Sequence, residues 1–245
     1  MDPKRICCPV CGGAVSHAAA ILSSIGFTVS DIADPDAAHL LLPVPVGQDL
    51  PTLFESLVPP MSENVLISGG NLDAVAARHR VVDFLKDPYY LAQNAAITAQ
   101  CAMTIIENQI PSLTDFPVLV TGWGRISKCL CRLLEKSGAE ITVAARKEAD
   151  RAMAGALGCR GISFEEAKDS STRYRLIVNT VPHMVLPDIP VREDCIILEL
   201  ASKPGVSGAN IIDGRRLPGR MAPEASGKLI AETFIRLSLE KEVTL

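Results

Sequence analysis

Residues 118–127 read Val-Leu-Val-Thr-Gly-Trp-Gly-Arg-Ile-Ser, an apolar run that leads directly into a Gly-x-Gly turn. Behind the turn, apolar residues recur at i, i+4, i+7 and i+8 from Ile126, the pattern of a helix that buries one face. Gly122 permits the tight turn, and Gly124 has no side chain to keep phosphates away from the backbone. A pyrophosphate can therefore bind at the helix N-terminus. The stretch predicts a dinucleotide site.

The third position of this fingerprint is Ser127, where Gly or Ala is usual, and serine is small enough to keep the helix close to the strand. A lone Gly-x-Gly also fits an ordinary strand-to-helix turn, so the elements that follow it matter. Trp123 is expected chiefly to pack at the turn. The residues that this stretch places at the cofactor are Gly122, Trp123, Gly124, Arg125 and Ile126.

The end of the next predicted strand bears on the type of dinucleotide. An NAD site places Asp or Glu there, about 20 residues beyond the glycines, to bind the ribose hydroxyls. This chain instead has Ala144-Ala145-Arg146-Lys147. Two cations without an acid can pair with a 2′-phosphate, so Arg146 and Lys147 favour NADP(H) over NAD. The alternative is that both are solvated residues at a helix start.

Beyond the glycine turn, predicted strands alternate with predicted helices. Short buried strands are expected at residues 141–145, 160–162, 174–179 and 195–200, and helices at 147–157 and 224–240. Such alternation is typical of a parallel sheet that is covered by helices. We therefore predict an α/β fold whose main part is a Rossmann-type doubly wound parallel sheet.

The N-terminal part is expected to form a smaller α/β domain. Its predicted strands are 6–10, 27–30, 39–44 and 64–68, with a helix over 16–24. Pro88 marks the start of a long Ala-rich helix over 89–109. The predicted division is an N-terminal domain over 1–88, a linker helix with the NADP-binding domain over 89–223, and a C-terminal helix over 224–245 that can pack back on the N-terminal domain.

Composition narrows the classes of function. The chain has 245 residues, a net charge of −4 and no run of Lys and Arg, so we expect neither nucleic acid nor an anionic membrane as a partner. No apolar segment suits a signal peptide or a bilayer span, which favours the cytoplasm. Cys8 and Cys11 form a Cys-Pro-Val-Cys motif, but no second pair accompanies it, so no metal is expected.

Three loops should reach the same edge of the main sheet, because the carboxyl ends of parallel strands line the cofactor crevice. Two follow predicted strands, at residues 179–183 and 201–205, and the third, 217–223, precedes the last helix. The residues of the first loop that we expect at the cofactor are Asn179, Thr180, Val181 and Pro182.

In their order and spacing, these blocks resemble the A subunit of dipicolinate synthase. No single block is specific, whereas the combination is. The resemblance covers most of residues 64–237, with fainter similarity at 39–46 and 67–71. It rests on Gly122-x-Gly124-Arg125, Ala145-Arg146, Asn179-Thr180-Val181-Pro182, residues 200–205 and Leu217-Pro218-Gly219-x-x-Ala222-Pro223.

The resemblance implies an NADP-dependent oxidoreductase that acts on a CH–CH bond. Dihydrodipicolinate, derived from hydroxytetrahydrodipicolinate, would be oxidised to aromatic dipicolinate during sporulation, with NADP⁺ taking a hydride. It implies a small dicarboxylate substrate, the flavoprotein-like B subunit of dipicolinate synthase as partner, and the cytoplasm of the mother cell of a spore-forming bacterium. We also expect a homo-oligomer.

A dicarboxylate needs cations and N–H donors, and the later loops carry both. The candidate catalytic residues are His183 and Lys203. An imidazole titrates near neutral pH, so His183 could accept the ring proton, although a histidine at a loop edge can equally cap or pack. Lys203 could bind a carboxylate or be a solvated loop residue. The predicted substrate-binding residues are Ser202, Lys203, Pro204, Gly205, Gly219 and Arg220.

Two other functions fit parts of the sequence. A non-catalytic NADP-binding regulatory or structural protein would suit departures from the family pattern, such as Lys203 in place of Arg. A shikimate-dehydrogenase-like reductase would share the Asn-Thr-x-Pro segment. Such enzymes rely on a Lys–Asp pair in the N-terminal domain, where this chain offers few lysines beyond Lys4 and Lys86.

Overall fold

The computed structural model of the chain describes residues 2–9, 12–47 and 64–239. Its contacts divide the chain into two units. The first unit combines residues 1–94 with 218–245, and the second comprises residues 95–217. Compared with the predicted division at residues 88 and 223, this one assigns 89–94 and 218–223 to the first unit.

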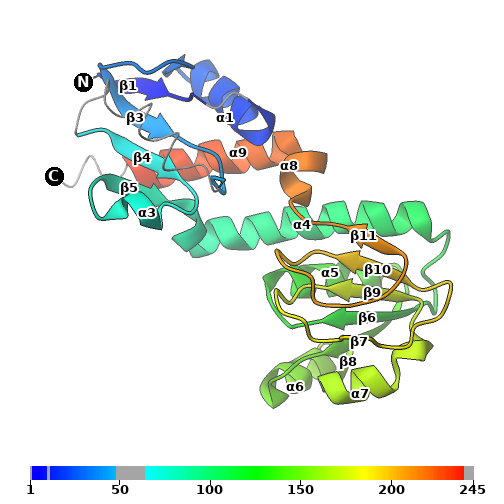
Figure 1. Cartoon of the computed structure of the whole chain (residues 1–245). Coiled ribbons are helices and arrows are strands. Elements are labelled where there is room, and N and C mark those ends of the chain that lie inside the picture. The colour runs from blue at the N-terminus through cyan, green and yellow to red at the C-terminus, as the bar shows by residue number, and fades with distance from the viewer. Residues whose placement is uncertain (1, 10–11, 48–63, 240–245) are drawn as a thin grey trace. The chain divides into compact units, whose positions relative to one another are not determined.

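The first unit has a five-stranded parallel sheet in the order β2-β1-β3-β4-β5 (Figure 1). The prediction of a second α/β domain is confirmed, but the two units are nearly equal in length because the first also includes residues 218–245. Its strands are β1 (Asp2–Cys7), β2 (Thr28–Ser30), β3 (Ala37–Leu41), β4 (Leu66–Gly69) and β5 (Arg80–Asp83). Its helices are α1 (Gly13–Ser24), α3 (Asp73–Ala76), η1 (Phe84–Lys86), the start of α4 (Pro88–Gln109), most of α8 (Leu217–Met221), α9 (Pro223–Phe234) and the π-helical η3 (Ile235–Leu239).

Helix α9 packs closely against α1 and completes the core of the first unit. A Cβ atom on Gly227 would lie 2.4 Å from Cβ of His17 and 2.6 Å from the carbonyl oxygen of Ala14, so only glycine allows this approach. The ring of Phe234 meets the buried ring of His39 edge-on, with centroids 5.1 Å apart. The C-terminal segment therefore covers strands that lie almost 200 residues before it in the sequence.

The second unit has a six-stranded parallel sheet in the order β11-β10-β9-β6-β7-β8. From β6 the chain builds β7 and β8 on one side and then returns to build β9, β10 and β11 on the other. This is the doubly wound Rossmann order with a switch point between β6 and β9, so the predicted fold class is confirmed. The strands are β6 (Pro117–Thr121), β7 (Glu140–Ala144), β8 (Arg160–Ile162), β9 (Leu176–Asn179), β10 (Ile196–Glu199) and β11 (Ile211–Asp213).

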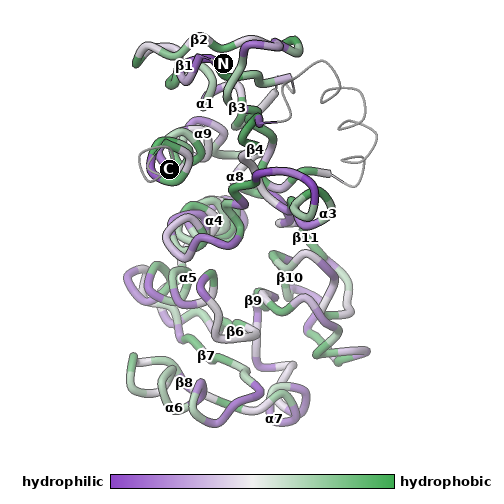
Figure 2. The backbone as a smooth tube through the Cα atoms, turned by 90° about the vertical axis from the view of Figure 1, so that its left-hand side faces the viewer, coloured by the Kyte–Doolittle hydropathy of each residue, from purple (hydrophilic) through white to green (hydrophobic). Residues whose placement is uncertain are grey.

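Two helices of the second unit, α5 (Arg125–Lys136) and α6 (Glu148–Ala156), follow the predicted pattern, whereas α7 (Phe164–Asp169) and η2 (Ser171–Arg173) were not predicted. In Figure 2 the turns of α5 alternate between hydrophilic and hydrophobic colours, as expected of a helix that covers one face of a sheet. Leu130 and Leu134 of α5 are fully buried, and Gly138 turns the chain into β7 with a φ of 79°. The end of α4 also belongs to this unit.

Several element boundaries differ from the predictions. Strand β1 starts at Asp2 and ends at Cys7, because its exposed polar residues pair with β2 and β3. Strands β5 and β11 were not predicted. Residues 217–221 form helix α8, although their Pro and Gly suggested a loop. Cys11 lies outside the described residues.

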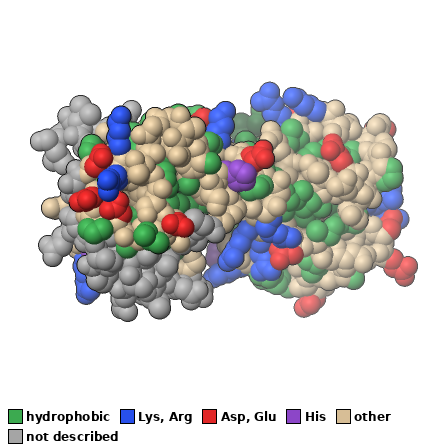
Figure 3. Space-filling view, turned by 90° about the horizontal axis from the view of Figure 1, so that it is seen from above, with side chains coloured by type: hydrophobic (Ala, Val, Ile, Leu, Met, Phe, Trp, Pro, Cys, Tyr) green, Lys and Arg blue, Asp and Glu red, His purple; other side chains and the backbone are tan. Residues whose placement is uncertain are grey.

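The described surface carries charges of both signs. On the face shown in Figure 3, acidic and basic side chains lie among one another, without one continuous basic surface. No helix of the described residues is long and apolar enough to cross a bilayer. Within the same residues, no cluster of three or more His, Cys, Asp or Glu side chains is arranged to hold a metal ion.

Candidate functional site

A cavity of about 370 Å³ opens beside the carboxyl ends of strands β6 and β7 of the second unit. Its volume lies within the usual range of small-molecule sites, roughly 300–1,000 Å³. Six predicted site residues therefore meet around one space: Gly122, Trp123, Arg146, Lys147, Val181 and His183. Four residues that were not predicted complete the wall: Ala145, Asp150, Phe164 and Val185.

The glycine turn has the geometry that the sequence predicted. Gly122 has a φ of 84°, and a Cβ atom on it would lie 2.8 Å from Cγ2 of Val181. Around Gly124, in contrast, no atom lies within 4 Å of a Cβ position, so space is left where a phosphate would approach. Lys128 donates the first intrahelical hydrogen bond, to the carbonyl of Gly124 at 3.1 Å. The N–H groups of the preceding turn, including Arg125 and Ile126, remain directed toward the helix start.

Trp123 combines two features that fit a ligand site. Its side chain is 8% exposed and forms part of the cavity wall, and Nε1 is buried without a hydrogen-bond partner among the described atoms. A buried indole N–H normally finds an acceptor. The Lys128 ammonium lies 5.9 Å from the ring centroid, at the edge of cation–π distance. The residues of the turn thus fit a bound dinucleotide.

Arg146 and Lys147 are exposed at the end of β7, where the sequence analysis placed them. The turn is held by Arg151, whose guanidinium donates to the carbonyls of Ala145 and Arg146 at 3.0 and 2.9 Å. Asp150, which the sequence analysis did not consider, lies in the same wall. Neither Arg146 nor Lys147 forms an ion pair with another described residue, so both suit a 2′-phosphate.

The segment after β9 contributes Val181 and His183 to the cavity, with exposed Pro182 between them. His183 is itself exposed, so a ligand can reach its imidazole. Thr180 lies against the glycine turn, where its hydroxyl donates to the carbonyl of Thr121 at 2.7 Å. The first predicted loop therefore faces the cavity through two of its five residues.

Asn179 was predicted to contact the cofactor, and the structure places it elsewhere. Its side chain is fully buried, and all four of its hydrogen-bonding positions are used within the protein. Oδ1 accepts from the hydroxyl of Thr121 and from Val181 N–H, and Nδ2 donates to the carbonyl of Val181 and to Glu199. Asn179 thus joins the ends of three strands.

Glu199 was not predicted as a functional residue from the sequence. It is 4% exposed and ends β10. Its carboxylate accepts the amide of Asn179 and the backbone N–H groups of Ala201 at 3.2 Å and Gly205 at 2.9 Å. A carboxylate at the end of the apolar run 195–200 was the available signal, because a charge that ends a buried strand needs partners.

The second predicted loop lies next to this network rather than in the cavity wall. Ser202, Lys203 and Pro204 are exposed, and among the described residues Lys203 has no acidic partner. Gly205 is buried against Asn179. The third predicted group, Gly219 and Arg220, is on α8 and belongs to the first unit.

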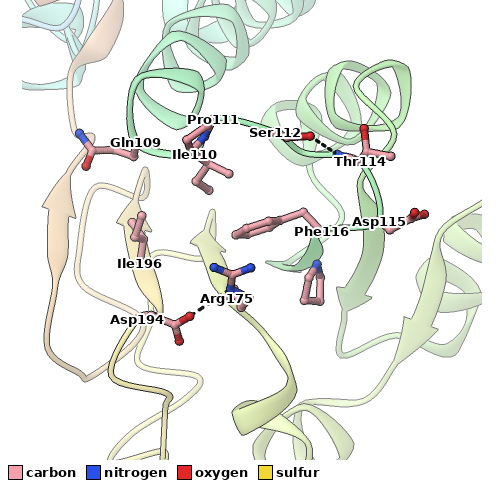
Figure 4. Close-up of a pocket in the computed structure, with 11 residues that line it drawn as sticks. Gln109, Ile110, Pro111, Ser112, Thr114, Asp115, Phe116, Arg175, Asp194 and Ile196 are labelled. Atoms are coloured by element: carbon pink, nitrogen blue, oxygen red, sulfur yellow. Dashed lines mark hydrogen bonds and ion pairs between the residues drawn. The ribbon is translucent and has the colours of Figure 1, made fainter.

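A second cavity, of about 320 Å³, opens at the opposite, amino-terminal edge of the same sheet (Figure 4). Arg175 lies over the ring of Phe116 at 4.6 Å and forms an ion pair of 3.1 Å with Asp194. Hydrogen bonds from Arg192 and Arg175 hold the pKa of Asp194 below its usual value. None of the predicted site residues lines this cavity.

Comparison with solved structures identifies the fold. The chain superposes on the A subunit of dipicolinate synthase from Bacillus halodurans with a TM-score of 0.82, at 18% identity over 97% of this chain and 98% of that one. The dipicolinate synthase A chain of Bacillus subtilis gives a TM-score of 0.80, at 18% identity over 100% and 99%. This chain has the fold of the dipicolinate synthase A chain.

Another solved structure and one curated sequence also match the chain. A transhydrogenase from Sinorhizobium meliloti matches with a TM-score of 0.68, at 13% identity over 98% of this chain and 94% of that one. Among curated sequences, glutamyl-tRNA reductase of Methanopyrus kandleri is 29% identical over 107 residues, which are 42% of this chain and only 26% of that protein. No family model matches the chain. The chain therefore shares its overall fold with these solved structures.

Proposed function

We propose that this chain is an NADP(H)-dependent oxidoreductase that oxidises dihydrodipicolinate to dipicolinate, in the role of the A subunit of dipicolinate synthase. The observation that supports it most is the cavity in which the glycine turn, the exposed cations Arg146 and Lys147 and an exposed histidine meet, in a chain with the fold of that protein. The B subunit of the same enzyme as partner, assembly into a homo-oligomer and a place in the mother-cell cytoplasm during sporulation are parts of the same proposal.

The residues around the cavity would have separate roles in binding the cofactor and in accepting a proton. Gly122, Gly124 and the start of α5 bind the pyrophosphate, and Arg146 with Lys147 binds the 2′-phosphate. Bound NADP⁺ supplies a hydride acceptor. His183 accepts a ring proton on an imidazole nitrogen as the ring becomes aromatic. The site has mainly to orient the ring, because aromatisation favours the oxidation.

The substrate carboxylates require cations, and Lys203 is the candidate in the second unit. Its ammonium is exposed on the loop after β10, with the hydroxyl of Ser202 beside it in sequence. Replacement of Lys203 by Ala should raise KM or lower kcat for the dicarboxylate and leave NADPH affinity unchanged. If neither kinetic constant changes, Lys203 does not bind the substrate.

A non-catalytic NADP-binding protein, regulatory or structural in role, is the second candidate. It is favoured by one observation: the cavity collects the cofactor residues, whereas Ser202 and Lys203 are outside its wall. A shikimate-dehydrogenase-like reductase has less support. Lys86 does pair with Asp73 at 2.6 Å, but the hydrogen bond and charge of Asp73 raise the pKa of Lys86, the wrong direction for a lysine base.

One purified sample separates these functions. Trp123 is the single tryptophan of the chain and lies in the cavity wall, so its fluorescence should report dinucleotide binding directly. Hydroxytetrahydrodipicolinate with NADP⁺ should produce dipicolinate absorbance, tested with and without the B subunit. NADPH binding without turnover in both cases supports the non-catalytic function. Failure to bind either dinucleotide excludes the redox function.

A further inference from the structure

We propose that Glu199 is a positioning residue that holds both the 200–205 loop and the His183 segment at the carboxyl edge of the second unit. The inference deepens the proposed function and rests on it for its catalytic consequence. Its structural part stands on the hydrogen bonds of a buried carboxylate. Glu199 lies outside the cavity wall and acts through the backbone that it binds.

Three N–H donors bind this carboxylate, from Asn179, Ala201 and Gly205. Oε1 accepts from Asn179 Nδ2 and from Ala201 N–H, and Oε2 accepts from Gly205 N–H. The charge of Arg215 also interacts with that of Glu199. Both ends of the 200–205 loop are thus attached to one acceptor-only side chain, while the exposed tip keeps Ser202 and Lys203 free.

Gly205, which is bonded to Glu199, also forms hydrogen bonds to the segment that lines the cavity. Its carbonyl accepts the N–H groups of Val185 at 2.9 Å and Leu186 at 3.1 Å. Val185 lines the cavity, and His183 is two residues before it. The backbone of Gly205 therefore connects Glu199 on one side with the histidine segment on the other.

The same segment is fixed at its other end through Asn179. Asn179 donates to the carbonyl of Val181 at 3.0 Å and accepts its N–H at 3.1 Å. Val181 in turn packs against Gly122 of the cofactor turn. Residues 181–185 are thus held from both ends, and Glu199 is bonded to both anchors, Asn179 and Gly205.

Glutamine at position 199 is the informative change because it keeps the shape and replaces one acceptor oxygen by an N–H₂ donor. Three N–H groups would then compete for a single oxygen, so at least one buried donor loses its acceptor. Glu193, six residues earlier and exposed, offers the matched control as E193Q.

Amide hydrogen exchange on the full chain tests the structural part without any assay of activity. In E199Q the amides of Ala201 and Gly205 should exchange about tenfold faster or more, the size expected when a hydrogen bond to a charged group is lost. The amides of Val185 and Leu186 should also exchange faster, because they donate to the backbone carbonyl of Gly205. E193Q and the amides of α5 should stay unchanged. Equal exchange of the four amides in both variants would overturn the inference.

If E199Q does not fold, two further measurements still test the proposal. Gly205→Ala keeps the carboxylate, but its Cβ would lie 2.4 Å from Asn179 Nδ2, so the amides of Val185 and Leu186 should again exchange faster. In the unaltered chain, the amides of Ala201 and Gly205 should exchange at least about tenfold more slowly than those of exposed Ser202 and Lys203. Equal rates at these four positions contradict the proposal.

The catalytic consequence is read separately. If the chain forms dipicolinate, E199Q should lower kcat/KM about tenfold while NADPH affinity, followed by Trp123 fluorescence, stays within about threefold. A merely structural role would weaken both in proportion and thereby contradict positioning. If no dipicolinate forms with the unaltered chain, the proposed function fails, and the exchange rates still decide the role of Glu199.

Discussion

Both units contain a strand–glycine–helix turn, but the residues around the two turns differ. In each, the first strand of a parallel sheet leads through glycines into a helix without a side-chain N-cap: β1 through Gly12 and Gly13 into α1, and β6 through Gly122 and Gly124 into α5. In the first unit, helix α9 lies against α1. In the second, the equivalent edge opens to a cavity that Arg146 and Lys147 line.

The difference shows that open space at a strand–glycine–helix turn does not by itself make a ligand site, because Gly12 of the first turn, like Gly124 of the second, has no atom within 4 Å of a Cβ position. At the first turn, a Cβ atom on Gly13 would meet only the carbonyl oxygen of Gly219, at 3.8 Å. The adjoining helix α1 serves packing, since Ala14 and His17 approach the backbone of α9. At the second turn, Gly122 is tightly enclosed, whereas Gly124 borders open space. Open space and positive charge together indicate the ligand edge.

The largest expected effect tests the packing role of the first unit. Gly227→Ala places a Cβ within 2.4–2.9 Å of His17, Ala14 and Ala18, so α1 and α9 must separate. We expect the free energy of unfolding, from urea denaturation followed by circular dichroism, to fall by about 2–3 kcal/mol. Gly155→Ala is the matched control, because a Cβ there meets no atom within 4 Å. That exposed helical glycine should give a gain of about 0.5–1 kcal/mol. Equal effects would refute the close contact.

Local sequence patterns predicted much of the fold. The helix start at Pro88, the strand Arg160–Ile162 and the amphipathic α5 follow from periodicity and from Gly and Pro positions. The edge strands β5 and β11 could not be predicted in this way. They have three or four residues with mixed polarity, and their extended form depends on pairing with β4 and β10.

The residues of the candidate site also differ in how far the sequence could predict their roles. The glycine turn and Arg146 were predictable, because each depends on neighbours in sequence. The roles of Asn179 and Glu199 were not, because they arise only when β6, β9 and β10 lie side by side. An asparagine near a glycine turn was therefore assigned to the cofactor, although its hydrogen bonds are all used within the protein.

The second prediction tests whether Arg146, in the wall of the second unit's cavity, binds the 2′-phosphate of the cofactor. Arg146→Ala removes a charge-assisted contact to the 2′-phosphate, so NADPH affinity should fall by roughly 10- to 150-fold, or about 1.5–3 kcal/mol. NADH affinity should change little. Trp123 fluorescence titrations with both dinucleotides measure the two losses, with Lys136→Ala, an exposed lysine of α5, as the control. Equal losses for NADPH and NADH would mean that Arg146 does not bind the phosphate.

The third prediction concerns the C-terminal segment of the first unit. Arg236 donates two hydrogen bonds to Asp87, whose side chain is 12% exposed and also accepts Tyr90 N–H at 2.8 Å. Burial opposes the charge of Asp87, but these hydrogen bonds hold its pKa below the usual value. Arg236→Met should lower the free energy of unfolding by about 1–2 kcal/mol at pH 7.

The pH dependence of that loss has a defined sign. A lowered carboxylate pKa gives stability that is present above the unfolded value near 3.8 and is lost as the pH falls through the folded pKa. The difference between the unaltered chain and Arg236→Met should therefore shrink below about pH 4. Lys228→Met, which breaks an exposed pair of 3.9 Å with Glu232, should cost only about 0–0.5 kcal/mol at any pH. A constant difference from pH 7 to pH 3 would exclude the ion pair as its source.

The smallest expected effect concerns a helix that begins with a side-chain cap, in contrast to α1 and α5, which begin without one. Helix α7 has a full capping box, in which Ser163 accepts Glu166 N–H at 3.1 Å and Glu166 accepts Ser163 N–H at 2.7 Å. The hydrogen bond from Ser163 N–H holds the pKa of Glu166 below its usual value near 4.5.

Glu166→Gln should lower the melting temperature slightly at pH 7, because the charged acceptor and its attraction to the helix dipole are lost. The difference should disappear as the pH falls below 4.5 through the folded pKa, since protonation removes the same charge from the unaltered chain. A difference that persisted in acid would assign the effect to side-chain shape. Helices α1 and α5 begin without a side-chain cap, so no such loss is expected there, and Gly122 and Trp123, just before the start of α5, line the cavity.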